Sequence, residues 1–205
     1  MLPVPADLVL RITELQRAAV VRWHGAPPDN PHAGLSATVC QQHQFNFLLW
    51  HEEDIARSPE VSDARIAEVK RAIDRYNQQR NDWIERIDEA LLEMFATEGI
   101  LPRTGARLNT ETPGSAIDRL SIMSLRIYHF EEQLARGDTD NVHRTTVAER
   151  LARCRLQHAD LSQSLTELLE DLWAGRKVLK VYRQMKMYND PTLNPYLYRA
   201  QKRAG

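Results

Sequence analysis

The sequence predicts an all-α protein, a single-domain bundle of about five helices with a long C-terminal helix and a docked C-terminal tail. Apolar residues recur in steps of three and four along most of the 205 residues, and the alternation typical of half-buried strands is absent. There are only 8 glycines, and the 10 prolines cluster at the expected joints. We therefore expect one helical domain over residues 1–205, with residues 189–205 as an irregular tail.

The first three helices are expected over residues 6–23, 36–57 and 63–97. The turn-rich string HGAPPDNPHAG ends the first helix, and Ser36 is a candidate N-cap for the second. The second helix carries apolar side chains on nearly every face, so we expect it to lie centrally in the bundle.

The last two helices follow a long connection over residues 98–112. Thr112 fits the N-cap of the fourth helix and Pro113 its first position, and this helix continues to ARGDTD. The fifth helix is expected over residues 145–187, where apolar residues alternate in steps of four and three. Four tyrosines in and near the remaining tail lead us to expect that it docks on the bundle.

The overall charge excludes some partners. With 27 basic and 28 acidic side chains the net charge is -1, so nothing global favours nucleic acid or a membrane surface. No stretch has the length of a transmembrane helix, and the N-terminus lacks the pattern of a signal peptide. Cys40 and Cys154 occupy apolar helical positions, which favours buried thiols in a reducing compartment and a cytoplasmic location.

Polar residues interrupt the apolar second helix in the string HQFNFLLWHEED, residues 43–54. On a helical wheel His43, Trp50 and Asp54 share one narrow face with Phe47. A buried polar group without a partner costs about 1–3 kcal/mol, so partners are expected on neighbouring helices. The candidates interrupt or border the apolar lines of helices three and four: Asn77, Arg80, Asn81, Asp88, Asp118, Ser121 and His129.

Two interpretations of these polar residues remain open. They form either a hydrogen-bond network that fixes helix register or a polar pocket that binds a ligand. Metal binding is a weaker alternative. His43, His51, Asp54, His129 and His158 have suitable side chains, but no HExxH, ExxH or CxxC spacing is present, so no metal site is predicted and the cofactor is unknown.

A metal-dependent, all-α nucleotide pyrophosphohydrolase is a further alternative. Such enzymes resemble paired helices with ExxE and ExxD motifs, and ERID supplies Glu85 and Asp88 in the second form only. The string TPGS also suggests a phosphate site at the start of helix four, where Gly114 and Ser115 leave backbone N–H groups accessible. Glu111 nearby opposes an anion, so plain helix capping is slightly preferred.

Several strings together resemble an uncharacterised bacterial family catalogued as a domain of unknown function. They contain the motifs WHEED, NQxRND, ETPGSxIDRLSI and KMYNDPxLNP, and the resemblance runs over residues 5–198. It implies no established activity, but it suggests a setting among glycosyltransferases and surface-polysaccharide genes. The residues to which it points are His43, Asn46, Trp50, His51, Glu53, Asp54, Asn77, Arg80, Asn81, Asp118, Arg119, Ser121, His129, Tyr188, Asn189 and Asp190.

The leading hypothesis is a polar pocket between helices two, three and four that binds a small anionic ligand, a sugar phosphate or nucleotide sugar. Its rival is a non-catalytic accessory protein for polysaccharide enzymes, with a homodimer or a glycosyltransferase as partner. Whether the protein is an enzyme stays open. The candidate catalytic residues are His43, His51, Asp54, Asp118 and His129, and the candidate ligand-binding residues are Asn46, Trp50, Asn77, Arg80, Asn81, Arg119, Ser121 and Tyr188.

Overall fold

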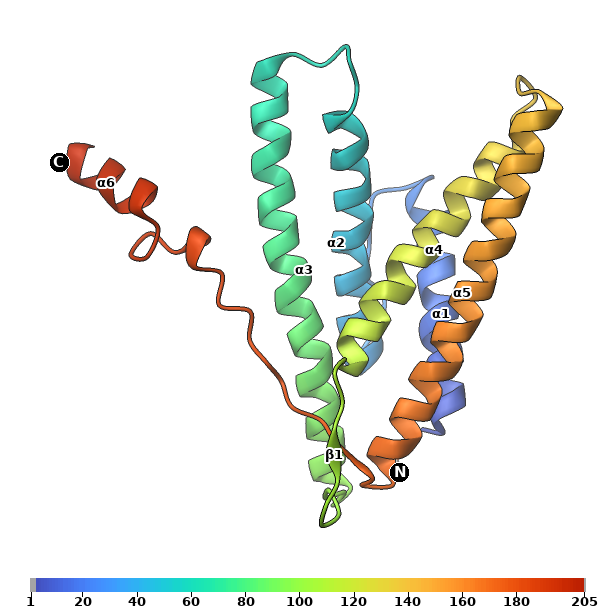
Figure 1. Cartoon of the computed structure of the whole chain (residues 1–205), viewed down its shortest axis with the longest axis vertical. Coiled ribbons are helices and arrows are strands. Elements are labelled where there is room, and N and C mark those ends of the chain that lie inside the picture. The colour runs from blue at the N-terminus through green and yellow to red at the C-terminus, as the bar shows by residue number, and fades with distance from the viewer. Residues whose placement is uncertain (1–2, 205) are drawn as a thin grey trace.

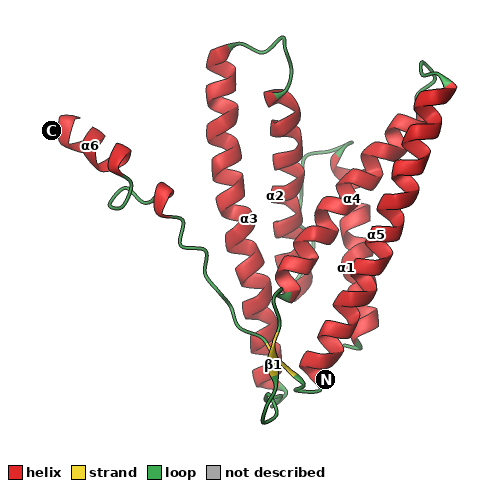
Figure 2. Ribbon diagram, viewed as in Figure 1, coloured by secondary structure: helices red, strands yellow, loops and turns green. Residues whose placement is uncertain are grey.

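The computed structural model describes residues 3–204 and is built almost entirely of helices (Figures 1 and 2). This confirms the predicted all-α bundle. In chain order the elements are α1 (Pro5–Trp23), α2 (Gly34–Ala56), α3 (Asp63–Thr97), β1 (Arg107–Leu108), α4 (Pro113–Ala135), α5 (Asn141–Trp173), β2 (Lys177–Val178), the 3₁₀ turn η1 (Met187–Asn189) and α6 (Pro195–Ala204).

Two helical hairpins form the bundle. Figure 1 shows α2 beside α3 and α4 beside α5, with the two pairs spreading apart toward one end. Helix α1 packs against α4, α5 and α2, while α2 contacts α1, α3 and α4. The predicted central place of the second helix is therefore confirmed, and three helices converge on the polar string that it carries.

Side-chain caps fix where α3, α4 and α5 begin. Ser62 accepts a hydrogen bond from the Arg65 N–H (3.4 Å), and Thr112 accepts one from the Ser115 N–H (3.2 Å). Helix α5 starts four residues earlier than predicted because Asp140, rather than a later residue, caps it through the His143 N–H (2.7 Å).

The prediction that the fifth helix continues to about residue 187 is wrong. Helix α5 ends at Trp173, and Gly175 has a φ of +66°, a backbone conformation that ends helices and favours glycine. A Cβ at Gly175 would lie 2.6 Å from the carbonyl oxygen of Leu101. The chain then enters β2, which pairs in parallel with β1 and so fastens the long 98–112 connection to the end of α5.

The tail does not remain irregular after residue 189, as the sequence had suggested, because it ends in α6. Its first part is attached to α3 by polar contacts: Arg183 pairs with Glu85 and Glu89, and Asn189 Nδ2 donates to Gln78 Oε1 (3.2 Å). The tyrosines do not cover the bundle as expected, since Tyr182, Tyr188 and Tyr196 are 67%, 63% and 88% exposed. Figure 1 shows α6 standing apart from the other helices.

Apolar side chains fill the space between the hairpins. A second, smaller cluster around Trp23, Phe47 and Leu125 packs against Trp50 and Tyr128 and supports the polar region described below. No helix within residues 3–204 has the length and apolar character needed to cross a membrane. The main core is formed by side chains of α1 to α5: Leu8, Val9, Ile12, Val39, Ile87, Leu91, Phe95, Ala116, Ile117, Leu120, Leu165, Leu168, Leu169 and Leu172.

Candidate functional site

A buried hydrogen-bond network joins α2 to α4. Asp118 Oδ1 accepts from Gln42 Nε2 (2.6 Å) and from Asn46 Nδ2 (2.9 Å). Asn46 Nδ2 also lies 2.8 Å from Ser121 Oγ, which in turn lies 2.6 Å from His43 Nδ1. Burial raises the pKa of Asp118, while the Arg80 guanidinium and the two amides act in the opposite direction.

His43 belongs to this network rather than to an accessible site. Its side chain is fully buried and its ring stacks on Trp23, with ring centroids 5.1 Å apart. Burial lowers the pKa of His43 to about 3, so the imidazole is neutral at physiological pH. His43 is therefore enclosed by protein and does not line the cleft described below.

A cleft of about 370 Å³ opens beside the network, between α2, α3 and α4. Five of its lining residues were predicted from the sequence, and a sixth, Glu53, is one to which the family resemblance points. The sequence did not single out Arg57 or the three apolar side chains. The lining residues are Asn46, Leu49, Trp50, Glu53, Asp54, Arg57, Asn77, Arg80, Ile122 and Leu125.

The charged side chains in the cleft differ in whether they have a partner of opposite charge. Arg57 pairs with Glu53 (2.5 Å) on its own helix, whereas Asp54 is exposed. Arg80 Nε lies 3.5 Å from Asp118 Oδ1, close enough for charge attraction. Its guanidinium nevertheless makes no hydrogen bond to any of residues 3–204, and 28% of the side chain is exposed. Arg80 therefore presents unused N–H donors to the cleft.

Four of the eight predicted ligand-binding residues lie outside this cleft. Arg119 is exposed on α4 and pairs with Glu111 (2.9 Å), and both line a different cleft beside α5. Asn81 is buried without lining the cleft, Tyr188 is exposed in the tail, and Ser121 lies behind Asn46 in the network. The single pocket expected from the sequence is therefore divided into a buried network and an open cleft.

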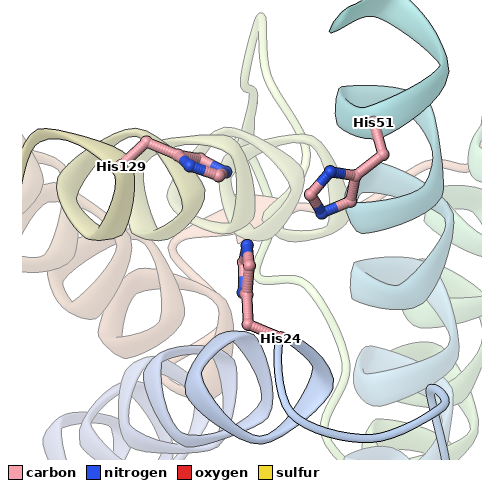
Figure 3. A group of neighbouring side chains, drawn as sticks. All are labelled: His24, His51 and His129. Carbon is pink, nitrogen blue, oxygen red and sulfur yellow. The ribbon is translucent and has the colours of Figure 1, made fainter. Parts of the chain in front are cut away.

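Three histidines form a separate cluster beside Phe47, whose ring contacts two of them. His24 follows the end of α1, His51 lies on α2 and His129 on α4, and one ring nitrogen of each lies within 4.8 Å of the others. Figure 3 shows the three rings converging from the three helices. His24 is not predictable from the sequence, because it follows the first helix in a turn-rich string and no linear spacing relates it to residues 51 and 129.

The start of α4 is filled by the protein's own carboxylate. Asp88 Oδ1 accepts from the Gly114 N–H (2.7 Å), and burial raises the pKa of Asp88 to about 6. The phosphate site considered at TPGS is thus occupied from within the chain. Glu85 accepts from Gln184 N (2.8 Å) and pairs with Arg183, so the two ERID carboxylates have partners within the chain and the geometry gives no support to a pyrophosphohydrolase.

Comparison with known proteins identifies the family. The model of a family described as a protein of unknown function (DUF4254) matches residues 36–181. The chain belongs to the DUF4254 family. Searches of curated proteins and of solved structures find no match. The DUF4254 region contains α2 from residue 36 on and all of α3 to α5, and hence every residue that lines the cleft. It also contains His51 and His129, whereas His24 lies before it and Tyr188 after it.

Proposed function

We propose that the protein binds a small anionic ligand, a sugar phosphate or nucleotide sugar, in the cleft between α2, α3 and α4. The observation that carries this proposal is the guanidinium of Arg80, which faces the cleft without a hydrogen bond to residues 3–204. A planar guanidinium with free donors suits the paired oxygens of a phosphate. Asp118 holds it in place by charge, while its Oδ1 is already bonded to Gln42 and Asn46.

The rest of the cleft supports a ligand with both a ring and hydroxyl groups. Asn77 lies one turn before Arg80 on α3, and its amide has no hydrogen bond within residues 3–204, so it can bind a hydroxyl. Trp50 gives the cleft a flat apolar wall against which a sugar or a base can pack. A volume of about 370 Å³ falls within the usual range for small-molecule sites.

The family resemblance favours sugar-containing ligands over other anions, because it suggests a setting in surface-polysaccharide metabolism. Two buried free thiols, Cys40 and Cys154, support the reducing, cytoplasmic compartment expected from the sequence. If the ligand is turned over, Asp54 in the cleft is the acid–base candidate that we favour, since His43 and Asp118 are enclosed.

A thermal-shift series in the presence of a metal chelator tests this proposal. The probes are UDP-glucose and glucose 1-phosphate, with glucose as the uncharged comparison. A ligand at a hundredfold excess over its Kd stabilises the fold by about 2.7 kcal/mol, which for a chain of this size raises Tm by about 5–10 °C. We expect such a rise for at least one anionic probe and none for glucose.

Three variants test whether the thermal shift arises from binding in the cleft. Arg80→Ala and Asn77→Ala should lose the shift while remaining folded by circular dichroism. Arg119→Ala is the matched control, because it removes an arginine that lies on the neighbouring helix, outside the cleft, in a pair with Glu111. A flat response to every anionic probe, or a shift that persists in Arg80→Ala, would contradict the proposal.

A second candidate function, protein binding as an accessory subunit for polysaccharide enzymes, rests on the tail. Five of its apolar or aromatic side chains are at least 61% exposed: Tyr182, Met185, Met187, Tyr188 and Tyr196. Such a concentration is unusual on a surface without a partner. Light scattering of the full chain and of a chain ending at Lys180 tests self-association. If the full chain is a dimer and the shortened chain a monomer, the partner is a second copy of the protein. If both chains are monomers, a second copy is ruled out as the partner.

A further inference from the structure

The Nε2 atoms of His24, His51 and His129 are all buried, and none has a hydrogen-bond partner among residues 3–204. They belong to three different helical regions, yet their rings converge on one point (Figure 3). An unsatisfied buried polar atom costs about 1–3 kcal/mol, and three in one place are rare unless something binds them.

Two of the rings are oriented by bonds at the opposite nitrogen. His24 Nδ1 lies 2.7 Å from the carbonyl oxygen of Val20, and His129 Nδ1 lies 2.7 Å from Glu132 Oε2. Both partners are acceptors, so each Nδ1 carries the hydrogen and each Nε2 has a free lone pair. Metal-binding histidines usually have this arrangement, with a carbonyl or carboxylate holding the far nitrogen.

Aromatic side chains enclose the cluster. Tyr128 stacks on His24 (centroids 4.1 Å apart, planes at 23°), Trp50 stacks on His129 (4.7 Å, 9°), and Phe47 contacts His24 and His51 edge-on. The rings can therefore turn only slightly.

We propose that His24, His51 and His129 bind a divalent transition-metal ion, zinc in the first place, through their three Nε2 atoms. Three imidazoles without an oxygen ligand suit zinc and its neighbours and do not suit calcium or magnesium. Tetrahedral zinc holds such nitrogens about 2.0–2.1 Å away, which places them about 3.4 Å from one another. The nitrogens, now at most 4.8 Å apart, approach by up to about 1.4 Å on binding, through rotations of the rings.

The site has the composition of a reactive centre rather than of a purely structural one. Three protein ligands leave a fourth position for water or for a ligand atom, as in zinc hydrolases and hydratases. Trp50 adjoins both the histidine cluster and the cleft, because its indole stacks on His129 and also lines the cleft wall. The metal proposal rests on different side chains from the anion proposal, so either can fail alone.

The experiment titrates metal-free protein with ZnCl₂ in competition with a chromophoric chelator, and with CoCl₂ by visible absorption. We expect one ion per chain and the intense cobalt bands of tetrahedral coordination. His24→Gln, His51→Gln and His129→Gln should each abolish competition. His158→Gln is the matched control, a half-buried histidine on α5 that lines a different cleft.

Glu132→Gln supplies a graded test. It leaves all three ligands in place and weakens only the bond at His129 Nδ1, so zinc affinity should fall about 10- to 100-fold with the stoichiometry unchanged. Zinc binding that is equal in the wild type and in all three ligand variants would overturn the proposal. An anomalous-scattering map covers the case of a ligand variant that does not fold. A zinc peak among the three rings is expected, and its absence from zinc-soaked crystals would also overturn the proposal.

Discussion

The indole of Trp50 lies flat on the imidazole of His129, with ring centroids 4.7 Å apart and planes inclined by 9°. The same indole lines the cleft that contains Arg80 and Asn77. One side chain thus forms a wall of both the proposed anion site and the proposed metal site. A disturbance on either side can reach the other through this ring.

Trp50→Ala should therefore weaken both kinds of binding. Loss of a stacked aromatic contact costs about 0.5–1.5 kcal/mol, which corresponds to about a 2- to 10-fold increase in each Kd. Trp50→Phe keeps an aromatic ring between the two sites and should increase both Kd values by less. Calorimetric titrations with zinc and with the best anionic probe give the two values. An increase in only one Kd would show that the wall serves one site alone.

His43 should make the protein sensitive to acid. Its pKa is lowered by burial to about 3, below the ordinary value of 6.5. Its contribution to stability is therefore complete above pH 6.5 and is lost as the pH falls from there toward 3, because the unfolded chain binds the proton more tightly. Between pH 7 and pH 5 the loss is about 2 kcal/mol. Urea unfolding of the wild type and of His43→Gln at several pH values measures this loss as the difference between their stability profiles. Parallel profiles would refute the prediction.

Asp88 should have the opposite effect. Burial raises its pKa from 3.8 to about 6, so its favourable contribution is present below pH 3.8 and is lost as the pH rises through 6. In Asp88→Asn an amide oxygen can still accept from the Gly114 N–H, so the fold should survive. Wild type should gain about 2 kcal/mol between pH 7 and pH 4.5 relative to the variant. Unfolding measured at the two pH values decides this, and an equal change in both proteins would contradict it.

Gly114 should tolerate no side chain. An added Cβ would lie 2.5 Å from the carbonyl oxygen of Ile84 and 3.0 Å from the Asp88 carboxyl group, so α4 would have to move away from α3. We expect Gly114→Ala to reduce the free energy of unfolding by about 1–3 kcal/mol or more. Gly137→Ala is the control, because a Cβ there meets no atom within 4 Å, and it should change stability by less than about 1 kcal/mol. Similar unfolding midpoints for both variants would show that the α3–α4 contact is less tight than the structure indicates.

The sequence predicted the elements better than the site. Periodicity identified the five long helices, and the Thr112–Pro113 pair identified the start of α4. The expected cap at Ser36 was wrong, because α2 already begins at Gly34. The end of α5 was missed because apolar spacing continues through residues 179 and 182, while the conformation of Gly175 interrupts the helix. A repeat of apolar positions shows which residues could lie on a seam, but it does not show where the backbone turns.

The site could be predicted only where its residues share a helix. Asn77 and Arg80 are one turn apart on α3, and Trp50 and Asp54 are one turn apart on α2, so a helical wheel placed each pair on one face. His24 joins His51 and His129 only through the packing of α1, α2 and α4. Likewise, Asp88 fills the start of α4 through a contact between helices that no local pattern describes.

The short parallel pairing of β1 with β2 has a consequence for how the chain folds. It joins positions 107 and 177, whereas α2–α3 and α4–α5 are hairpins whose helices are adjacent in sequence. Closing a long loop costs more entropy than closing a short one, so we expect the hairpins to form first and this pairing to form last. The amides of Arg103 and Arg107, which bond to the Gly175 and Arg176 carbonyls, should then exchange with solvent sooner than those of the helices. The tail departs directly after β2, so its point of attachment is the last part of the bundle to assemble and the first to open.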